Sequence, residues 1–362
     1  MLPTHAPNSP QRRRARRGDV FPIAPGVPVA SRDVLRAVMR PLRAVERRNV
    51  VVLGRDGTLH ANRAALLSAF EAVTVPDGAR LGDGGFDLTG LLRALVPDAL
   101  GRGVTPSCHS EKSGPYRRVY SKPGYAYVAA RVYLPSDMTG EMHENKDAGH
   151  GDTAFIYLGG WGSRGGAVDA GFQHGHYAKK PQDDWAPFFL VQQVGARSAI
   201  TVSKEKQASG APWRLRGGQE VSVKFWVTRV QDGTHLNLFM QGVLSEDGTE
   251  ACLTLSAPVD ERFGWDATGG RNVMKRMTTI GQTYEQENLT SGSFMHGVRW
   301  SDAVIGATEA DAHPWTANDT GGYCSFPDPK TPEGKRADDP SRGKWEVKFV
   351  SAAEETDSIT LS

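Results

Sequence analysis

Residues 125–134 alternate aromatic or charged side chains with small apolar ones. In an extended strand Tyr125, Tyr127, Arg131 and Tyr133 would share one face, opposite the apolar side chains. Sugar rings stack on aromatic side chains through their C–H faces, and their hydroxyls need polar partners in fixed positions. The row therefore predicts a face that binds a hydroxylated ligand.

Two shorter rows have the same character. Trp226 follows Lys224 by two residues in one candidate strand, and Tyr284 follows Gln282 in another. Tyr and Trp are also common strand residues, and their rings can simply cover a second small core. Since one sequence does not fix the register between strands, both interpretations stay open from the residues alone.

The most distinctive segment is 168–173, followed by Trp185-Ala186-Pro187. In strand geometry Asp169 and Gln173 point to the same side. An acid and an amide on one face can grip a hydroxylated ligand, or they can bond to backbone groups and pin a loop. The complete set of candidate ligand-binding residues is Tyr125, Tyr127, Arg131, Asp169, Gln173, Trp185, Trp226, Gln282 and Tyr284.

A two-residue period from Tyr116 onward predicts the strands that position these rows. Residues 220–230, 235–243 and 251–255 alternate in this way, and Asp-Gly pairs at 232–233 and 247–248 predict hairpin turns between them. Further segments of the same kind follow without a helical period between them. They predict a mainly β fold, an antiparallel β-sandwich of jelly-roll, concanavalin-like type.

The first 104 residues differ in composition from the rest. Residues 1–50 hold eleven arginines and three acids, so they carry +8 while the whole chain carries +2. We predict a disordered basic tail over 1–30, a small α+β domain over 31–104 and the sandwich domain over 105–362. Apolar spacing predicts a helix over 33–48 that Pro41 kinks or divides, and a second helix that Asn62 caps. The basic tract has no interleaved aromatic residue, so nucleic-acid binding is not expected.

Patterns for catalysis and for metal binding are weak. Lyases that act on polysaccharides combine a Tyr, a His or Gln and an Arg. Tyr284, Gln173 and Arg131 supply these residue types, but the strand motifs of such enzymes are absent. No strand carries the spaced carboxylates that glycoside hydrolysis needs. Neither a metal nor a cofactor is predicted.

The three cysteines stand at wide spacings, so they allow at most one disulfide bond and form no metal signature. The sequence as written shows no apolar signal region at its start and no apolar stretch of membrane-spanning length. We therefore predict no membrane span and leave the compartment open.

Several segments resemble the YrpD-like proteins of bacteria. The resemblance covers about residues 114–306 and rests on Tyr157-x-Gly159, Asp169-x-Gly171-Phe172-Gln173, Trp185-x-Pro187 and Phe225-Trp226. It implies a secreted jelly-roll protein and leaves its activity unassigned. This chain departs from that pattern by adding residues 1–113 and by showing no signal peptide.

Three functions follow from these patterns. The first is a non-catalytic carbohydrate-binding or cell-envelope interaction protein, whose ligand is a polysaccharide or an envelope glycan. The second is a polysaccharide lyase or glycoside hydrolase that works on the concave sheet face. The third is a structural protein that docks a protein partner through residues 31–104. Aromatic and polar side chains share strand faces without paired catalytic residues, which favours binding over catalysis.

Overall fold

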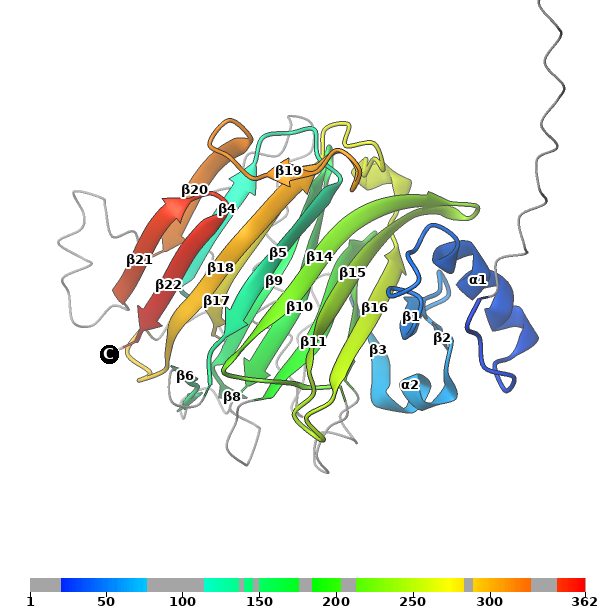
Figure 1. Ribbon diagram of the computed structural model, residues 1–362, viewed down its shortest axis with the longest axis horizontal. Coiled ribbons are helices and arrows are strands. Elements are labelled where there is room, and N and C mark those ends of the chain that lie inside the picture. The colour runs from blue at the N-terminus through cyan, green and yellow to red at the C-terminus, as the bar shows by residue number, and fades with distance from the viewer. Residues whose placement is uncertain are drawn as a thin grey trace, which may run out of the picture.

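The chain folds as a β-sandwich of two large, mainly antiparallel sheets (Figure 1). The computed structural model describes residues 21–76, 114–136, 140–145, 150–175, 184–202, 213–282, 289–326 and 344–361. Sheet A has eleven strands and sheet B nine, and two short strands, β7 (Glu144–Asn145) and β8 (His150–Gly151), pair separately. The predicted fold class is confirmed.

Sheet A runs in the order β2 (Leu59–Ala61), β1 (Val50–Leu53), β16 (Glu250–Pro258), β15 (Gly233–Val243), β14 (Gln219–Val230), β5 (Tyr127–Leu134), β18 (Phe294–Gly306), β22 (Glu354–Thr360) and β21 (Lys344–Ser351). The short strands β19 (His313–Pro314) and β6 (Gly140–Glu141) also pair with β18. A single turn of 3₁₀-helix, η1 (Glu261–Phe263), follows β16.

Sheet B runs in the order β20 (Thr320–Phe326), β4 (Tyr116–Ser121), β17 (Val273–Gly281), β9 (Thr153–Gly162), β10 (Gly165–Gly175), β11 (Asp184–Gln193), β12 (Ala196–Val202) and β3 (Phe70–Pro76). The two-residue strand β13 (Leu215–Arg216) pairs with β11.

The alternation in the sequence decides which side of each strand enters the core. On β14, Val221, Val223 and Phe225 are buried between the sheets, while Lys224 and Trp226 point the other way. The predicted turn at Asp232-Gly233 leads from β14 into β15, with Val230 opposite Gly233. Burial of the apolar rows stabilises the sandwich, at roughly 25 cal/mol for each Å² of apolar surface.

Residues 50–76 extend both sheets of the sandwich, although sequence patterns placed them in a separate unit. Strand β1 pairs in parallel with β16 of sheet A, and β3 pairs antiparallel with β12 of sheet B. The boundary predicted at residue 104 and most of the predicted tail lie outside the described residues. None of the helices in the ranges given above is long and apolar enough to cross a membrane.

The two helices near the start of the described chain differ in their bounds from the predicted ones. Helix α1 (Val29–Met39) ends just before Pro41, where a kink or division was predicted, because the proline ring and its missing N–H prevent a regular continuation. Helix α2 (Ala64–Ala69) stops at Phe70, where β3 begins. Pairing of β3 with β12 outweighs the helical spacing of the apolar residues here.

The predicted helix-capping residue Asn62 instead joins three stretches of chain. Its Oδ1 accepts a hydrogen bond from the Val50 N–H at 2.9 Å, and its Nδ2 donates to the carbonyls of Pro22 and Arg47, both at 3.0 Å. The side chain is fully buried. Asn62 therefore fixes residues 22 and 47–50 against β2.

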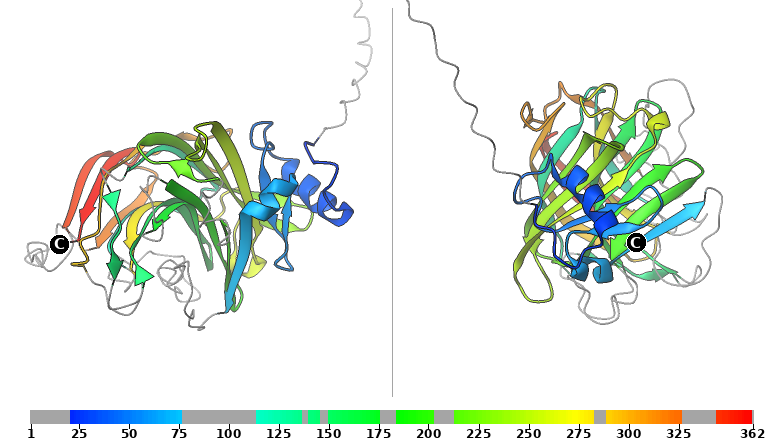
Figure 2. Two further views of the ribbon diagram at one scale, coloured as in Figure 1. Left: turned by 90° about the horizontal axis from the view of Figure 1, so that it is seen from below. Right: turned by 90° about the vertical axis from the view of Figure 1, so that its right-hand side faces the viewer.

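Both sheets bend in the same sense, and sheet A lies on the outer side of the bend (Figure 2). The sandwich consequently has two surfaces that point away from the core. We call them the outer face of sheet A and the concave face of sheet B. Helix α1 packs beside the sandwich next to β1, at the end where β2 forms the edge of sheet A (Figure 1).

Candidate functional site

The outer face of sheet A carries Tyr127 and Trp226, which lie opposite each other on β5 and β14. The Tyr127 hydroxyl donates to Glu309 Oε1 at 3.1 Å, and burial together with this carboxylate raises the pKa of Tyr127. Lys224 Nζ lies 3.1 Å from Glu46 Oε1 and 3.3 Å from Glu309 Oε1. These side chains hold neighbouring chain segments on sheet A.

Trp226 has a similar role, because its ring packs against the apolar cluster formed by α1 and β1. Two further predicted residues also have partners within the chain. Arg131 is an exposed residue that forms an ion pair with Glu220. Tyr125 donates to Asp319 Oδ1 at 2.7 Å, and burial and this bond raise its pKa to about 12.

Three predicted residues lie away from both faces or outside the described chain. Trp185 is buried in the core, and its Nε1 donates to the Pro135 carbonyl at 2.8 Å. Gln282 is also buried, and its Nε2 donates to Asp152 Oδ1 at 3.1 Å. Tyr284 lies outside the described residues. Trp185 and Gln282 therefore bond within the chain.

Asp169 and Gln173 lie on the concave face of sheet B, away from Tyr127 and Arg131. The nine predicted residues are therefore not brought together in one groove. The period of two predicted which side of its own strand each residue occupies. It could not predict that β5 belongs to sheet A and β10 to sheet B, so that their outward sides face in opposite directions.

Asp169 forms an ion pair with Lys275 that crosses an intervening strand. Both residues are in register with Gly159 of β9, Asp169 on one side and Lys275 on the other. Because Gly159 has no side chain, the ammonium group and the carboxylate meet above it. Both charged side chains are buried, and burial raises the pKa of Asp169 while Lys275 opposes the rise.

Aromatic rings surround the ammonium group of Lys275. Its Nζ lies 4.4 Å from the centre of the Trp161 ring and 5.3 Å from that of Tyr157. The guanidinium carbon of Arg118 lies 5.6 Å from the Trp161 ring centre and 5.1 Å from that of Tyr116. Two cations thus contact one indole ring, an arrangement in which the ring's electron-rich face stabilises positive charge.

Arg197 and Gln173 extend the polar part of this face toward β12. Gln173 Nε2 donates to Thr201 Oγ1 at 3.3 Å, and Arg197 acts with Arg118 to stabilise the charged form of Asp169. Thr201 is in turn in register with Glu71 of β3. The described part of the face holds three cations, Lys275, Arg118 and Arg197, and two acids, Asp169 and Glu71.

Close packing of β10 against β9 explains why the Asp169-x-Gly171 motif has a glycine at position 171. A Cβ atom at Gly171 would lie 2.3 Å from the Ile156 carbonyl oxygen and 2.6 Å from the Tyr157 Cα atom. Only glycine lets β10 approach β9 this closely. The motif therefore presents Asp169 and Gln173 on either side of a side-chain-free position, with the Tyr157 ring beside it.

Sequence reasoning missed Lys275, Arg118, Trp161, Tyr157 and Arg197. Lys275 lies on β17 (Val273–Gly281), close to its first residue, and it was not chosen as a candidate. A period of two over 275–279 places Lys275 on the same side as Thr279. The pairing across Gly159 depends on strand register, and the sequence does not contain that directly.

A second arrangement looks catalytic at first sight. Ser256 Oγ lies 3.1 Å from His235 Nδ1, and His235 Nε2 lies 3.3 Å from Asp232 Oδ2. Ser256 and His235 are both buried, and burial lowers the pKa of His235. A nucleophile must reach its substrate, so we interpret this trio as a structural hydrogen-bond chain across β15 and β16.

Two other features bear on the chemistry of the chain. Among the residues that the structure describes, no group of three or more His, Cys, Asp or Glu side chains is placed to hold a metal ion. Cys324, on the concave face, is disulfide-bonded, whereas Cys252 is a free thiol. Comparison with protein-family models and with curated proteins found no match for this chain.

Proposed function

We propose that the protein is a non-catalytic binding module for an acidic polysaccharide, and that the ligand lies along the concave face of sheet B. The observation that carries the proposal is the Trp161 ring with Lys275 and Arg118 beside it, on the same face as Asp169 and Gln173. These five side chains are buried, so they supply positive charge and positioned polar groups beneath the surface, while the partly exposed Tyr120 on the same face supplies a ring for stacking.

The residue types fit a chain of sugar acids. Guanidinium groups recognise carboxylates or sulfates through paired N–H donors, and aromatic rings offer flat surfaces for sugar C–H groups. Asp169 is neutralised by Lys275, so Arg118 and Arg197 outnumber the remaining acid, Glu71. An anionic ligand therefore meets a favourable field on this face, and a neutral one gains only the stacking.

Accessibility decides which residues would contact the ligand first. Asp169 and Lys275 are buried, whereas Tyr120 on β4 and Arg197 on β12 are partly exposed. Tyr120 is in register with Lys275, so these two partly exposed residues lie on opposite sides of the central ion pair. We assign the ligand contacts to them and a supporting role to the buried pair.

Binding to a polyuronate and to a neutral glucan, measured by isothermal titration calorimetry, tests the proposal. Arg197→Gln should weaken polyuronate binding about tenfold, the effect of losing one charge-assisted hydrogen bond. Arg131 is an exposed arginine on the outer face of sheet A, so Arg131→Gln is the matched control. This variant should bind the polyuronate like the wild type. Equal affinity of both variants, or equal binding of the two polysaccharides, would overturn the proposal.

A specific observation favours a second candidate, a polysaccharide lyase. Such an enzyme needs a base beside cations that neutralise the uronate carboxylate. Tyr120 is in register with Lys275 and is partly exposed, so a uronate can reach its hydroxyl. Incubation with polyuronate would release unsaturated products that absorb in the ultraviolet. Loss of that product in Tyr120→Phe would identify the tyrosine as the base.

The resemblance to YrpD-like proteins stays a prediction, and it is compatible with either candidate. It implies export, and the disulfide bond at Cys324 supports export as well, because disulfide bonds persist mainly in oxidising compartments. A glycan of the cell envelope would be within reach of such a protein.

A further inference from the structure

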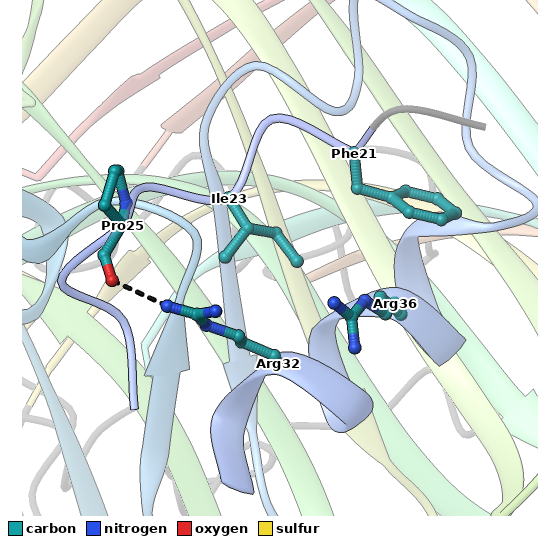
Figure 3. A pocket seen from close by; sticks show the side chains of 5 residues that line it. All are labelled: Phe21, Ile23, Pro25, Arg32 and Arg36. Carbon is teal, nitrogen blue, oxygen red and sulfur yellow. Dashed lines mark hydrogen bonds between the residues drawn. The ribbon is translucent and has the colours of Figure 1, made fainter. Parts of the chain in front are cut away.

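A pocket of about 200 Å³ lies between residues 21–25 and helix α1, far from the concave face (Figure 3). Phe21, Ile23 and Pro25 form its apolar side, and Arg32 and Arg36 of α1 form its charged side. Figure 3 shows both guanidinium groups beside the three apolar residues. The two arginines are one helical turn apart, so they project from the same side of α1.

The charge of Arg32 is not neutralised within the described chain. Its Nε donates to the Val27 carbonyl at 3.0 Å and its Nη2 to the Pro25 carbonyl at 2.6 Å. These acceptors fix the guanidinium without cancelling its charge. Among the described residues no carboxylate forms an ion pair with Arg32, so the pocket keeps a positioned positive group.

Arg36 can bind a ligand carboxylate with little loss of protein stability. Its Nη1 lies 3.1 Å from Asp33 Oδ1, but the side chains of both residues are at least half exposed. Exposed ion pairs of this kind contribute little to stability, so a ligand carboxylate can replace Asp33. The planar fork of a guanidinium is well suited to hold such a group through two parallel hydrogen bonds.

The surroundings of the pocket are also basic. Residues 21–50 contain six arginines and two acids, and one of those acids, Glu46, is buried and paired with Lys224. The guanidinium of Arg47 lies 5.2 Å from the centre of the Phe21 ring, which keeps it at the apolar side of the pocket. This field would steer an acidic partner toward α1.

We propose that the pocket docks an acidic peptide segment of a partner protein, through an anchor residue that joins an apolar side chain to a carboxylate. Complementarity supports this choice of partner, because the pocket has an apolar side next to two guanidinium groups within a basic surface. Its volume lies below the ~300 Å³ at which sites for whole small molecules begin, so it suits one anchor group. A C-terminal aromatic or leucine residue has this chemistry.

Fluorescence anisotropy with the full chain tests the proposal. The probe is a labelled peptide with several acidic residues and a C-terminal Phe, compared with the same peptide amidated at its C-terminus. The free-carboxylate peptide should bind more tightly than the amide. Arg36→Gln should weaken it about tenfold, the effect expected from a charge-assisted hydrogen bond.

Arg262→Gln is the matched control, because Arg262 is likewise exposed and pairs locally with Asp260. This variant should bind the peptide like the wild type. Equal affinity of the two peptides, or equal effects of the two substitutions, would overturn the proposal and indicate a general anion-binding surface. Tighter binding after removal of residues 1–20 would also overturn it, by making that segment the natural occupant. None of these readouts depends on polysaccharide binding.

Discussion

Glu355 and Asp357 lie two residues apart on the same buried face of β22, and their pKa values shift in opposite directions. Although burial opposes it, the charges of Arg276 and Arg117 lower the pKa of Glu355 to about 2. Burial and the nearby Glu355 charge raise the pKa of Asp357. These four ionisable residues join β22 of sheet A to β4 and β17 of sheet B.

Replacing the two acids should therefore have unequal effects on stability. Glu355 accepts from Arg117 Nη2 at 2.6 Å and from Arg276 Nη1 at 3.0 Å, so Glu355→Gln leaves two buried guanidinium groups without their counter-charge. We expect a loss of about 3–5 kcal/mol in the free energy of unfolding. Asp357→Asn can keep the hydrogen bond from Thr278 and removes the cost of holding this acid in the core above its ordinary pKa, so it should not lower the free energy of unfolding. Urea unfolding of both variants at neutral pH checks this, and equal losses would contradict it.

The same pair predicts how stability depends on pH. The pKa of Glu355 is lower in the folded state than its ordinary 4.5, so its contribution is complete above that value and is lost as the pH falls toward about 2. The raised pKa of Asp357 acts in the opposite sense. Its contribution is present below its ordinary 3.8 and is lost as the pH rises through the folded-state value.

Unfolding curves across the acid range separate these two contributions. Glu355→Gln should flatten the fall in stability between about pH 4.5 and 2, relative to the wild type. Asp357→Asn should leave that fall in place and remove the loss of stability above pH 3.8. If the two variants kept the wild-type profile, the ion cluster would not control the response to acid.

Gly159 offers a test of the ion pair that crosses β9. A Cβ atom on Gly159 would lie 2.0 Å from the Val168 carbonyl oxygen, whereas one on Gly175 of the neighbouring strand has its nearest contact, Thr153 Oγ1, at 3.5 Å. Gly159→Ala should lower the free energy of unfolding by about 2 kcal/mol or more, through overpacking and through separation of Asp169 from Lys275. Gly175→Ala, the control, should cost less than about 1 kcal/mol in thermal or urea unfolding. Similar costs would mean that β9 and β10 are not packed this closely.

A substitution at Trp226 tests which face of the sandwich binds the ligand. Because the Trp226 ring packs against the α1 cluster, Trp226→Ala should lower the free energy of unfolding by about 1–3 kcal/mol. The affinity of this variant for a polyuronate, measured by calorimetry, should match that of the wild type. A loss of affinity in a variant that stays folded would move the ligand site to the outer face of sheet A.

The side of a strand on which a residue lies could be predicted from the sequence, whereas the pairing of distant segments could not. Alternation placed Val132 in the core and Arg131 outside, because the two sides of a strand are fixed by a period of two. The Asp-Gly pair at 232–233 correctly predicted a turn, because these residue types favour short hairpin connections. Sequence patterns did not predict that Phe70 leaves a helix to pair with β12, because that choice depends on a partner far away in the chain.

The candidate site was predictable only in part. The period of two correctly placed Asp169 and Gln173 on one side of a strand. Their partner Lys275 is more than a hundred residues away and reaches Asp169 only because Gly159 lies between them. Such a contact requires the register of three strands, and one sequence contains no direct signal for it.

The placement of β1 and β3 has a consequence for self-association. Exposed strand edges present unpaired N–H and C=O groups to other chains, which is a common route to aggregation. Residues 50–76 add strands to β16 and β12, so one short segment covers an edge of each sheet. A protease that cleaved between β1 and β3 would weaken the attachment of β1 to β16 and of β3 to β12. Cleaved chains that lost these strands would expose β16 and β12 and would be prone to pair with one another.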